Sequence, residues 1–134
     1  MNLPTRLRYL RIALVAVGLI FIFGVGPLMM AFWPSGWRWQ PNQLEYEQMI
    51  LGVYATLGVF LLLASRDPLK NRSLIWFTVW SSLVHSVIMA AQAMNAPNEH
   101  SHLFGDVPAL AVVALVLAVL MPRGSLAEAA ASDA

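Results

Sequence analysis

LIWFTVWSSLVHSVIMAAQAM, residues 74–94, is the stretch that decides the fold. It is apolar over the roughly 20 residues that an α-helix needs to cross the hydrocarbon core of a bilayer. One ionisable residue, His85, lies near its middle. The 134-residue chain is 11% charged, whereas soluble domains average roughly 25%. Both observations indicate a membrane protein.

Three further apolar runs have comparable lengths, so four membrane spans are predicted in all. The expected spans are residues 12–32, 46–65, 74–94 and 104–121. Short connections make sequential helices antiparallel neighbours, so we expect an all-α protein with an up-down antiparallel bundle of four transmembrane helices. Residues 1–121 then form a single domain, and residues 122–134 form a flexible polar C-terminal tail.

The basic residues predict how the chain is oriented in the membrane. The first apolar run is too long for a typical signal peptide and lacks a convincing cleavage site, so it is expected to remain as the first span. Seven basic residues adjoin span ends on one side: Arg6, Arg8, Arg11, Arg66, Lys70, Arg72 and Arg123. Only Arg38 lies on the other side. The positive-inside rule therefore predicts that both termini are cytoplasmic.

The connections contain further signals. Trp33, Trp37 and Trp39 follow the first span among proline and glycine residues, a pattern typical of a segment at the membrane interface. An aromatic lip around a ligand is the alternative interpretation. Pro27 is expected either to kink the end of the first span or to mark where the helix frays. A polar loop is expected over residues 95–106.

One face of the third span carries residues at three- and four-residue steps. These residues are Thr78, Ser82, His85, Met89 and Gln92. Because an unpaired polar group in hydrocarbon costs several kcal/mol, this face is expected to point into the bundle. Tyr54 of the second span lies at a depth similar to that of His85, and its phenol can form a hydrogen bond with the imidazole.

Two interpretations of this face remain open. In the first, His85 is a neutral, hydrogen-bonded residue that fixes how the helices pack. In the second, His85 is functional, because an ionisable residue inside a membrane span is by default a functional-site hypothesis. It would then carry protons, hold a quinone head group or ligate haem. Haem is disfavoured because bis-histidine ligation requires two histidines at membrane depth. The candidate ligand-binding residues are His85, Tyr54, Ser82, Thr78, Met89 and Gln92.

A second group of candidates lies at the side opposite the basic residues. Imidazole and carboxylate together suit zinc, copper, nickel or iron, so a metal site is one hypothesis. Its candidate ligands are His100, His102, Glu47 and Asp106. The competing interpretation is a polar loop with acidic residues that complement helix dipoles. The chain has no cysteine and no recognisable catalytic motif, so an enzyme is disfavoured and no catalytic residue or cofactor is assigned.

A resemblance to a known family rests on three stretches of the sequence. They are residues 52–90, GVYATLGVFLLLASRDPLKNRSLIWFTVWSSLVHSVIMA, the preceding GPLMMAFWPSGWRW and the following FGDVPALAVV. They resemble a family of small four-span bacterial membrane proteins classed as a domain of unknown function. The likeness covers nearly the whole chain and implies this architecture and a bacterial inner-membrane location, with no activity. In span number and size the chain is also similar to DoxX-like proteins, which is fold analogy alone.

The function expected from these observations is that of a non-enzymatic accessory or self-associating subunit of a membrane complex. Its partners would be the lipid bilayer and either a second copy or a larger complex, since small residues allow close helix packing in membranes. The glycines that could serve this purpose are Gly18, Gly24, Gly52 and Gly58. A net charge of +1 gives no reason to expect nucleic acid. The alternative is a membrane protein that binds a small molecule, a quinone or a metal at the candidate residues.

Overall fold

The computed structural model describes residues 1–34, 38–39, 41 and 43–124. Every regular element among these residues is a helix. The elements are α1 (Leu3–Leu19), η1 (Ile20–Leu28), α2 (Met29–Phe32), α3 (Leu44–Ala64), α4 (Arg72–Asn95), η2 (Pro97–Phe104) and α5 (Asp106–Leu120). Trp37 and residues 125–134 of the predicted tail lie outside the described residues.

Four continuous helical segments in this part of the chain are long and apolar enough to cross a membrane. They are Leu3–Phe32, Leu44–Ala64, Arg72–Asn95 and Pro97–Leu120. The prediction of an all-α membrane protein with four spans is therefore confirmed. The first helix starts within the basic stretch rather than after it, and the last begins in the stretch expected to be a polar loop, which forms the 3-10 helix η2.

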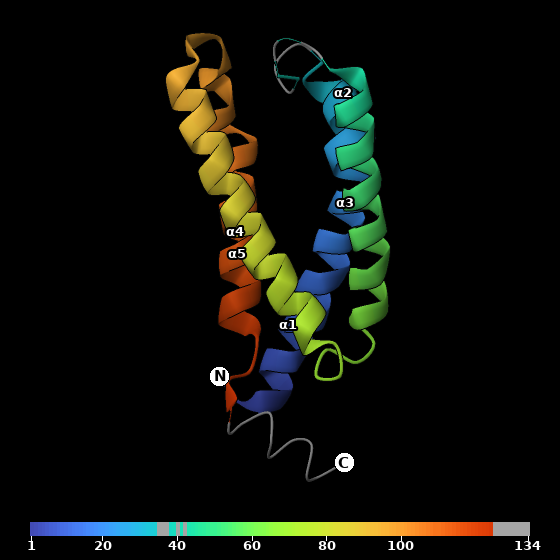
Figure 1. Ribbon diagram of the computed structural model, residues 1–134. Coiled ribbons are helices and arrows are strands. Elements are labelled where there is room, and N and C mark those ends of the chain that lie inside the picture. Colours follow the sequence, from blue (N-terminus) through green and yellow to red (C-terminus); the bar gives the residue numbers. More distant parts are fainter. Residues whose placement is uncertain (35–37, 40, 42, 125–134) are drawn as a thin grey trace.

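The helices form two pairs arranged as a V (Figure 1). α1 and η1 pack along α3, and α4 packs along α5. The pairs meet at the end where α1 begins and α3 turns into α4, and they diverge toward the other end. We call the first the arginine end, after Arg6, Arg66 and Arg72, and the second the tryptophan end, after Trp33 and Trp39. The predicted bundle is therefore open at one end.

The apolar core holds the two pairs together toward the arginine end. Its buried members are Leu10, Leu14, Val17, Phe21, Leu61, Ile75, Val79, Ala114, Leu117 and Met121. The α1 and η1 residues recur at steps of four, three and four, which is the spacing of one helix face. No hydrogen bond is lost when such a face is buried, because the backbone N–H and C=O groups of a helix are already paired.

The first span passes through Pro27 without a break. Residues 20–28, which include Pro27, form the π-helix η1, and α2 continues to Phe32. Proline lacks a backbone N–H and its ring crowds the carbonyl one turn earlier, so a wider turn is a natural way to accommodate it. The helix therefore does not fray at Pro27.

α1 and α3 approach each other most closely at Gly18 and Gly58. A Cβ atom on Gly58 would lie 2.6 Å from the Gly18 carbonyl oxygen, and one on Gly18 would lie 2.9 Å from the Gly58 oxygen. Two of the four glycines considered for self-association therefore pack within the chain. Gly24 faces Ile20 of its own helix, whereas a Cβ on Gly52 would meet nothing within 4 Å.

The hairpin between α3 and α4 is held by Asp67. Lys70 Nζ lies 3.2 Å from its carboxylate, and Asn71 Nδ2 donates to its backbone carbonyl at 2.9 Å. The hydrogen bond from the Lys70 side chain holds the pKa of the Asp67 carboxyl below its usual value. These contacts close the tight turn that the sequence predicts here.

Arg6 caps the C-terminal end of α5. Its Nε donates to the Leu120 carbonyl at 3.2 Å, and its Nη2 donates to the Val119 carbonyl. Carbonyls in the last turn of a helix have no intrahelical partner, and a cation is favourable there. Arg6→Met should therefore lower the free energy of unfolding by about 1–3 kcal/mol, measured by thermal unfolding in mild detergent. Arg8→Met, at an exposed neighbouring position, is the control, and an equal loss in both variants would contradict the capping role.

Candidate functional site

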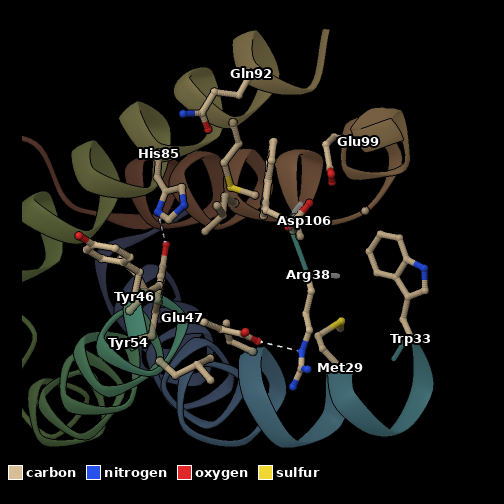
Figure 2. Close-up of a pocket in the computed structure, with 18 of the residues that line it drawn as sticks. Met29, Trp33, Arg38, Tyr46, Glu47, Tyr54, His85, Gln92, Glu99 and Asp106 are labelled. Carbon is tan, nitrogen blue, oxygen red and sulfur yellow. Dashed lines mark hydrogen bonds and ion pairs between the residues drawn. The ribbon is translucent and has the colours of Figure 1, made fainter. Parts of the chain in front are cut away.

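A cavity of about 1240 Å³ lies where the two helix pairs diverge (Figure 2). Side chains from all four membrane segments line it, and most of them are apolar. Representative lining residues are Phe21, Val25, Leu51, Met89, Leu110 and Val113. Ligand pockets usually measure roughly 300–1,000 Å³, so this cavity has room for a complete small molecule.

The cavity is open to the outside rather than enclosed. Tyr46 on α3 and Gln92 on α4 both line it and both have exposed side chains. Ile50, one turn after Tyr46, is exposed in the same way.

The deepest polar group of the cavity is a hydrogen-bonded pair. Tyr54 Oη lies 2.7 Å from His85 Nδ1, as the sequence predicts. The Phe21 ring packs edge-on against the Tyr54 ring, with 4.9 Å between centroids. His85 is half-buried and lines the cavity. It lies about 15–20 Å from either end of α4 at ~1.5 Å per residue, which places the pair near mid-membrane.

The predicted polar face of α4 divides into two parts. Met89 and Gln92 line the cavity together with His85. Thr78 and Ser82 are buried but do not line it, and the Thr78 hydroxyl donates to the Leu74 carbonyl of its own helix at 2.9 Å. Of the six candidate ligand-binding residues, Tyr54, His85, Met89 and Gln92 line the cavity.

At the tryptophan end, four side chains surround His102. Its Nδ1 lies 2.9 Å from the Asp106 carboxylate, and its Nε2 lies 3.2 Å from Glu99. The second contact has an ion-pair distance without the alignment of a hydrogen bond. The Trp39 ring stacks on the imidazole with 4.4 Å between centroids, and the Trp33 ring lies at 5.7 Å. We call these five residues the His102 cluster.

The His102 cluster covers the cavity at the tryptophan end. Its carboxylates and both tryptophans line the cavity, so the segment after α2 and helix η2 meet over it. A second ionic contact, 3.2 Å between Arg38 Nε and Glu47 Oε1, lies in the same wall (Figure 2). Trp33 and Trp39 therefore line the cavity at the tryptophan end.

The four predicted metal ligands do not converge. His102 and Asp106 are in contact, but Glu47 pairs with Arg38 and His100 is exposed. Within the described part of the chain, no group of three or more His, Cys, Asp or Glu side chains could hold a metal ion. Both ring nitrogens of His102 face carboxylates, which leaves neither nitrogen directed at an ion.

Glu99, Arg38 and Ser86 were not among the predicted ligands, although Glu99 lies in the predicted polar loop and Ser86 at the edge of the predicted polar face. The Ser86 hydroxyl donates to the Val107 carbonyl at 2.9 Å and so links α4 to α5 beside the cavity. The spacing of Glu99, His102 and Asp106, at steps of three and four, was a usable signal, since residues so spaced share a helix face.

Four apolar helices around an open cavity define a small multi-pass α-helical membrane protein. The chain belongs to a family of unknown function, DUF6632, whose profile matches residues 4–133. The family membership expected from the sequence is therefore confirmed, whereas the expected likeness to DoxX-like proteins is not shown. Comparison with the curated proteins and with the solved structures yields no match.

Proposed function

We propose that this protein binds a lipophilic small molecule of the bilayer in the cavity between its two helix pairs. The observation that carries the proposal is the hydrogen-bonded pair of Tyr54 and His85 in the wall of a mostly apolar cavity whose charged residues lie toward the tryptophan end. Apolar pockets with a few convergent polar groups are typical ligand sites, and an ionisable residue at membrane depth marks function by default.

The geometry favours binding over a pure packing role for His85. A histidine that only fixes helix packing would be enclosed by neighbouring helices, whereas His85 is half-buried beside a space of about 1240 Å³. Tyr46, Ile50 and Gln92 line the cavity, are exposed and belong to helices of membrane length, so we expect the ligand to arrive from the membrane rather than from water. A quinone or another weakly polar lipophile fits these conditions.

A second candidate function is that of an accessory or self-associating subunit. Gly52 supports it, because it lies on an exposed part of α3 with open space beyond its Cα, and glycine lets a neighbouring membrane helix approach closely. Separation of the gently solubilised protein by native mass tests this. A strictly monomeric species without a co-purifying partner would contradict it.

We also propose that the protein lies in a bacterial inner membrane, with the arginine end on the cytoplasmic side. The N-terminus, the hairpin after α3 and the end of α5 share this end (Figure 1), and it carries seven of the eight basic residues. Both termini would then be cytoplasmic under the positive-inside rule. Labelling of single cysteines introduced at residues 2 and 98 in intact cells distinguishes the two sides.

Filling the cavity tests ligand binding. Ala109 and Val112 are both exposed on α5, but Ala109 lines the cavity and Val112, almost one turn later, does not. Ala109→Phe should reduce the amount of lipophilic compound that co-purifies with the protein in nanodiscs by about tenfold, as expected for a lost fit of about 1.4 kcal/mol, while Val112→Phe should retain it. The compound is quantified by mass spectrometry of a solvent extract. Equal retention by both variants, or no retained compound in the wild type, would overturn the proposal.

A further inference from the structure

The hydrogen bond between Tyr54 and His85 fixes which proton the imidazole carries. The Oη–Nδ1 distance is 2.7 Å. A phenol O–H is a stronger donor than a neutral imidazole N–H, and an imidazole nitrogen is a stronger acceptor than a phenol oxygen. The hydroxyl therefore donates to Nδ1, and the ring proton resides on Nε2, because the bond made by one ring nitrogen sets the state of the other.

Nε2–H of His85 requires an acceptor that the described residues do not supply. The hydrogen bonds of this part of the chain engage His85 through Nδ1 alone. Figure 2 shows the ring projecting from α4 beside the cavity, which His85 lines. A donor left unpaired in hydrocarbon costs several kcal/mol, so an acceptor on a bound molecule is favoured here.

We infer that the bound molecule is neutral and presents a carbonyl-type oxygen to His85 Nε2. This inference rests on the proposed function and names the class of its ligand. The depth of His85 selects against phospholipid head groups, which stay at the interface, and against ionised groups, which are costly at the bilayer centre. Glu47, which pairs with Arg38 at 3.2 Å, lies in the same wall but about two turns of α3 nearer the surface than Tyr54.

A donor at this position also discriminates between redox states of a quinone. The oxidised ring offers carbonyl oxygens, which are good acceptors. The hydroxyl oxygen of the reduced ring is a poor acceptor because its lone pair is delocalised. The oxidised form should bind about fivefold more tightly, the equivalent of one ordinary hydrogen bond. Tyr54 acts as a positioning residue, because it holds the tautomer and does not contact the ligand in this arrangement.

The test uses the full-length protein in nanodiscs and a quinone with a decyl side chain, in its oxidised and reduced forms. Binding is followed by quenching of tryptophan fluorescence, since Trp33 and Trp39 line the cavity. His85→Leu should weaken binding of the oxidised form about five- to tenfold and remove the preference between forms. His85→Gln retains a hydrogen-bond donor, so it should restore part of the affinity for the oxidised form and part of the preference for it over the reduced form. Tyr54→Phe should reduce this preference.

A second measurement reads the tautomer directly and keeps the inference testable if His85→Leu does not fold. Nitrogen-15 NMR of histidine-labelled protein should show His85 with Nδ1 unprotonated and Nε2 protonated, and Tyr54→Phe should disturb that state. The opposite tautomer in the wild type, unchanged affinity in His85→Leu, or no binding of either quinone form would overturn the inference. The cavity proposal would survive each of these results if Ala109→Phe still removed the co-purified lipophile, so the two failures are distinguishable.

Discussion

His102→Ala is expected to lower the free energy of unfolding by about 2–3 kcal/mol, because it leaves buried polar groups without the partner that they contact. The His102 side chain is fully buried between the carboxylates of Glu99 and Asp106. Glu99 is itself only 4% exposed, so the variant leaves two acidic groups in the wall without the imidazole between them. Loss of the Trp39 stacking contact adds to the effect.

His100→Ala is the matched control because His100 lies on the same short helix and is exposed. Its free energy of unfolding should change by less than about 0.5 kcal/mol. Both variants are compared by thermal unfolding in mild detergent and by steric trapping in bicelles. If the two variants lost equal free energy of unfolding and the wild-type protein held a bound metal ion, the result would instead support the metal site predicted from the sequence.

Much of the fold could be predicted because apolar length is a direct physical requirement of a bilayer. Depth along a helix is equally direct, at about 1.5 Å per residue, which is why counting from the span ends paired Tyr54 with His85. Both inferences use distances along single helices. Neither requires knowledge of how one helix crosses another.

The V shape and its cavity depend on helix crossing, which the sequence does not encode locally. The close approach of Gly18 and Gly58 and the core at the arginine end bring the pairs together at one end only. Helix periodicity alone could not show that this approach would be intramolecular, so both glycines were equally good candidates for contacts between chains.

The sequence placed His102 and Asp106 in one group but did not indicate that His102 is buried, because polarity at a membrane interface predicts exposure. A histidine and two carboxylates can nevertheless be buried together when each group has a partner of opposite character. Glu99 and His102 are buried in η2 for this reason, and they bring Trp39 over the cavity. The tryptophans were assigned to the interface, as their amphipathic rings suggest, while their contact with His102 depends on tertiary structure.

Gly58→Ala should destabilise the protein by about 2 kcal/mol, the cost typical of overpacking a tight contact. The added methyl group would lie 2.6 Å from the Gly18 carbonyl oxygen and 2.8 Å from Ile22 Cγ1. Backbone cannot yield as a flexible side chain does, so α1 and α3 must move apart. Replacing glycine by alanine also stabilises a helix by up to about 1 kcal/mol, which partly offsets the steric cost. Gly52→Ala measures this gain alone, because a Cβ atom there meets nothing within 4 Å. Stability is measured as for His102→Ala.

Gly58→Ala should also weaken binding of the oxidised decyl quinone, whereas Gly52→Ala should not. Tyr54 lies about one helical turn from Gly58, so moving α3 away from α1 shifts the phenol relative to His85 on the opposite pair. The 2.7 Å hydrogen bond between them would lengthen, and the imidazole would lose its fixed tautomer. If Gly58→Ala instead matched Gly52→Ala in both stability and binding, the close approach of α1 and α3 would not be what positions the cavity wall.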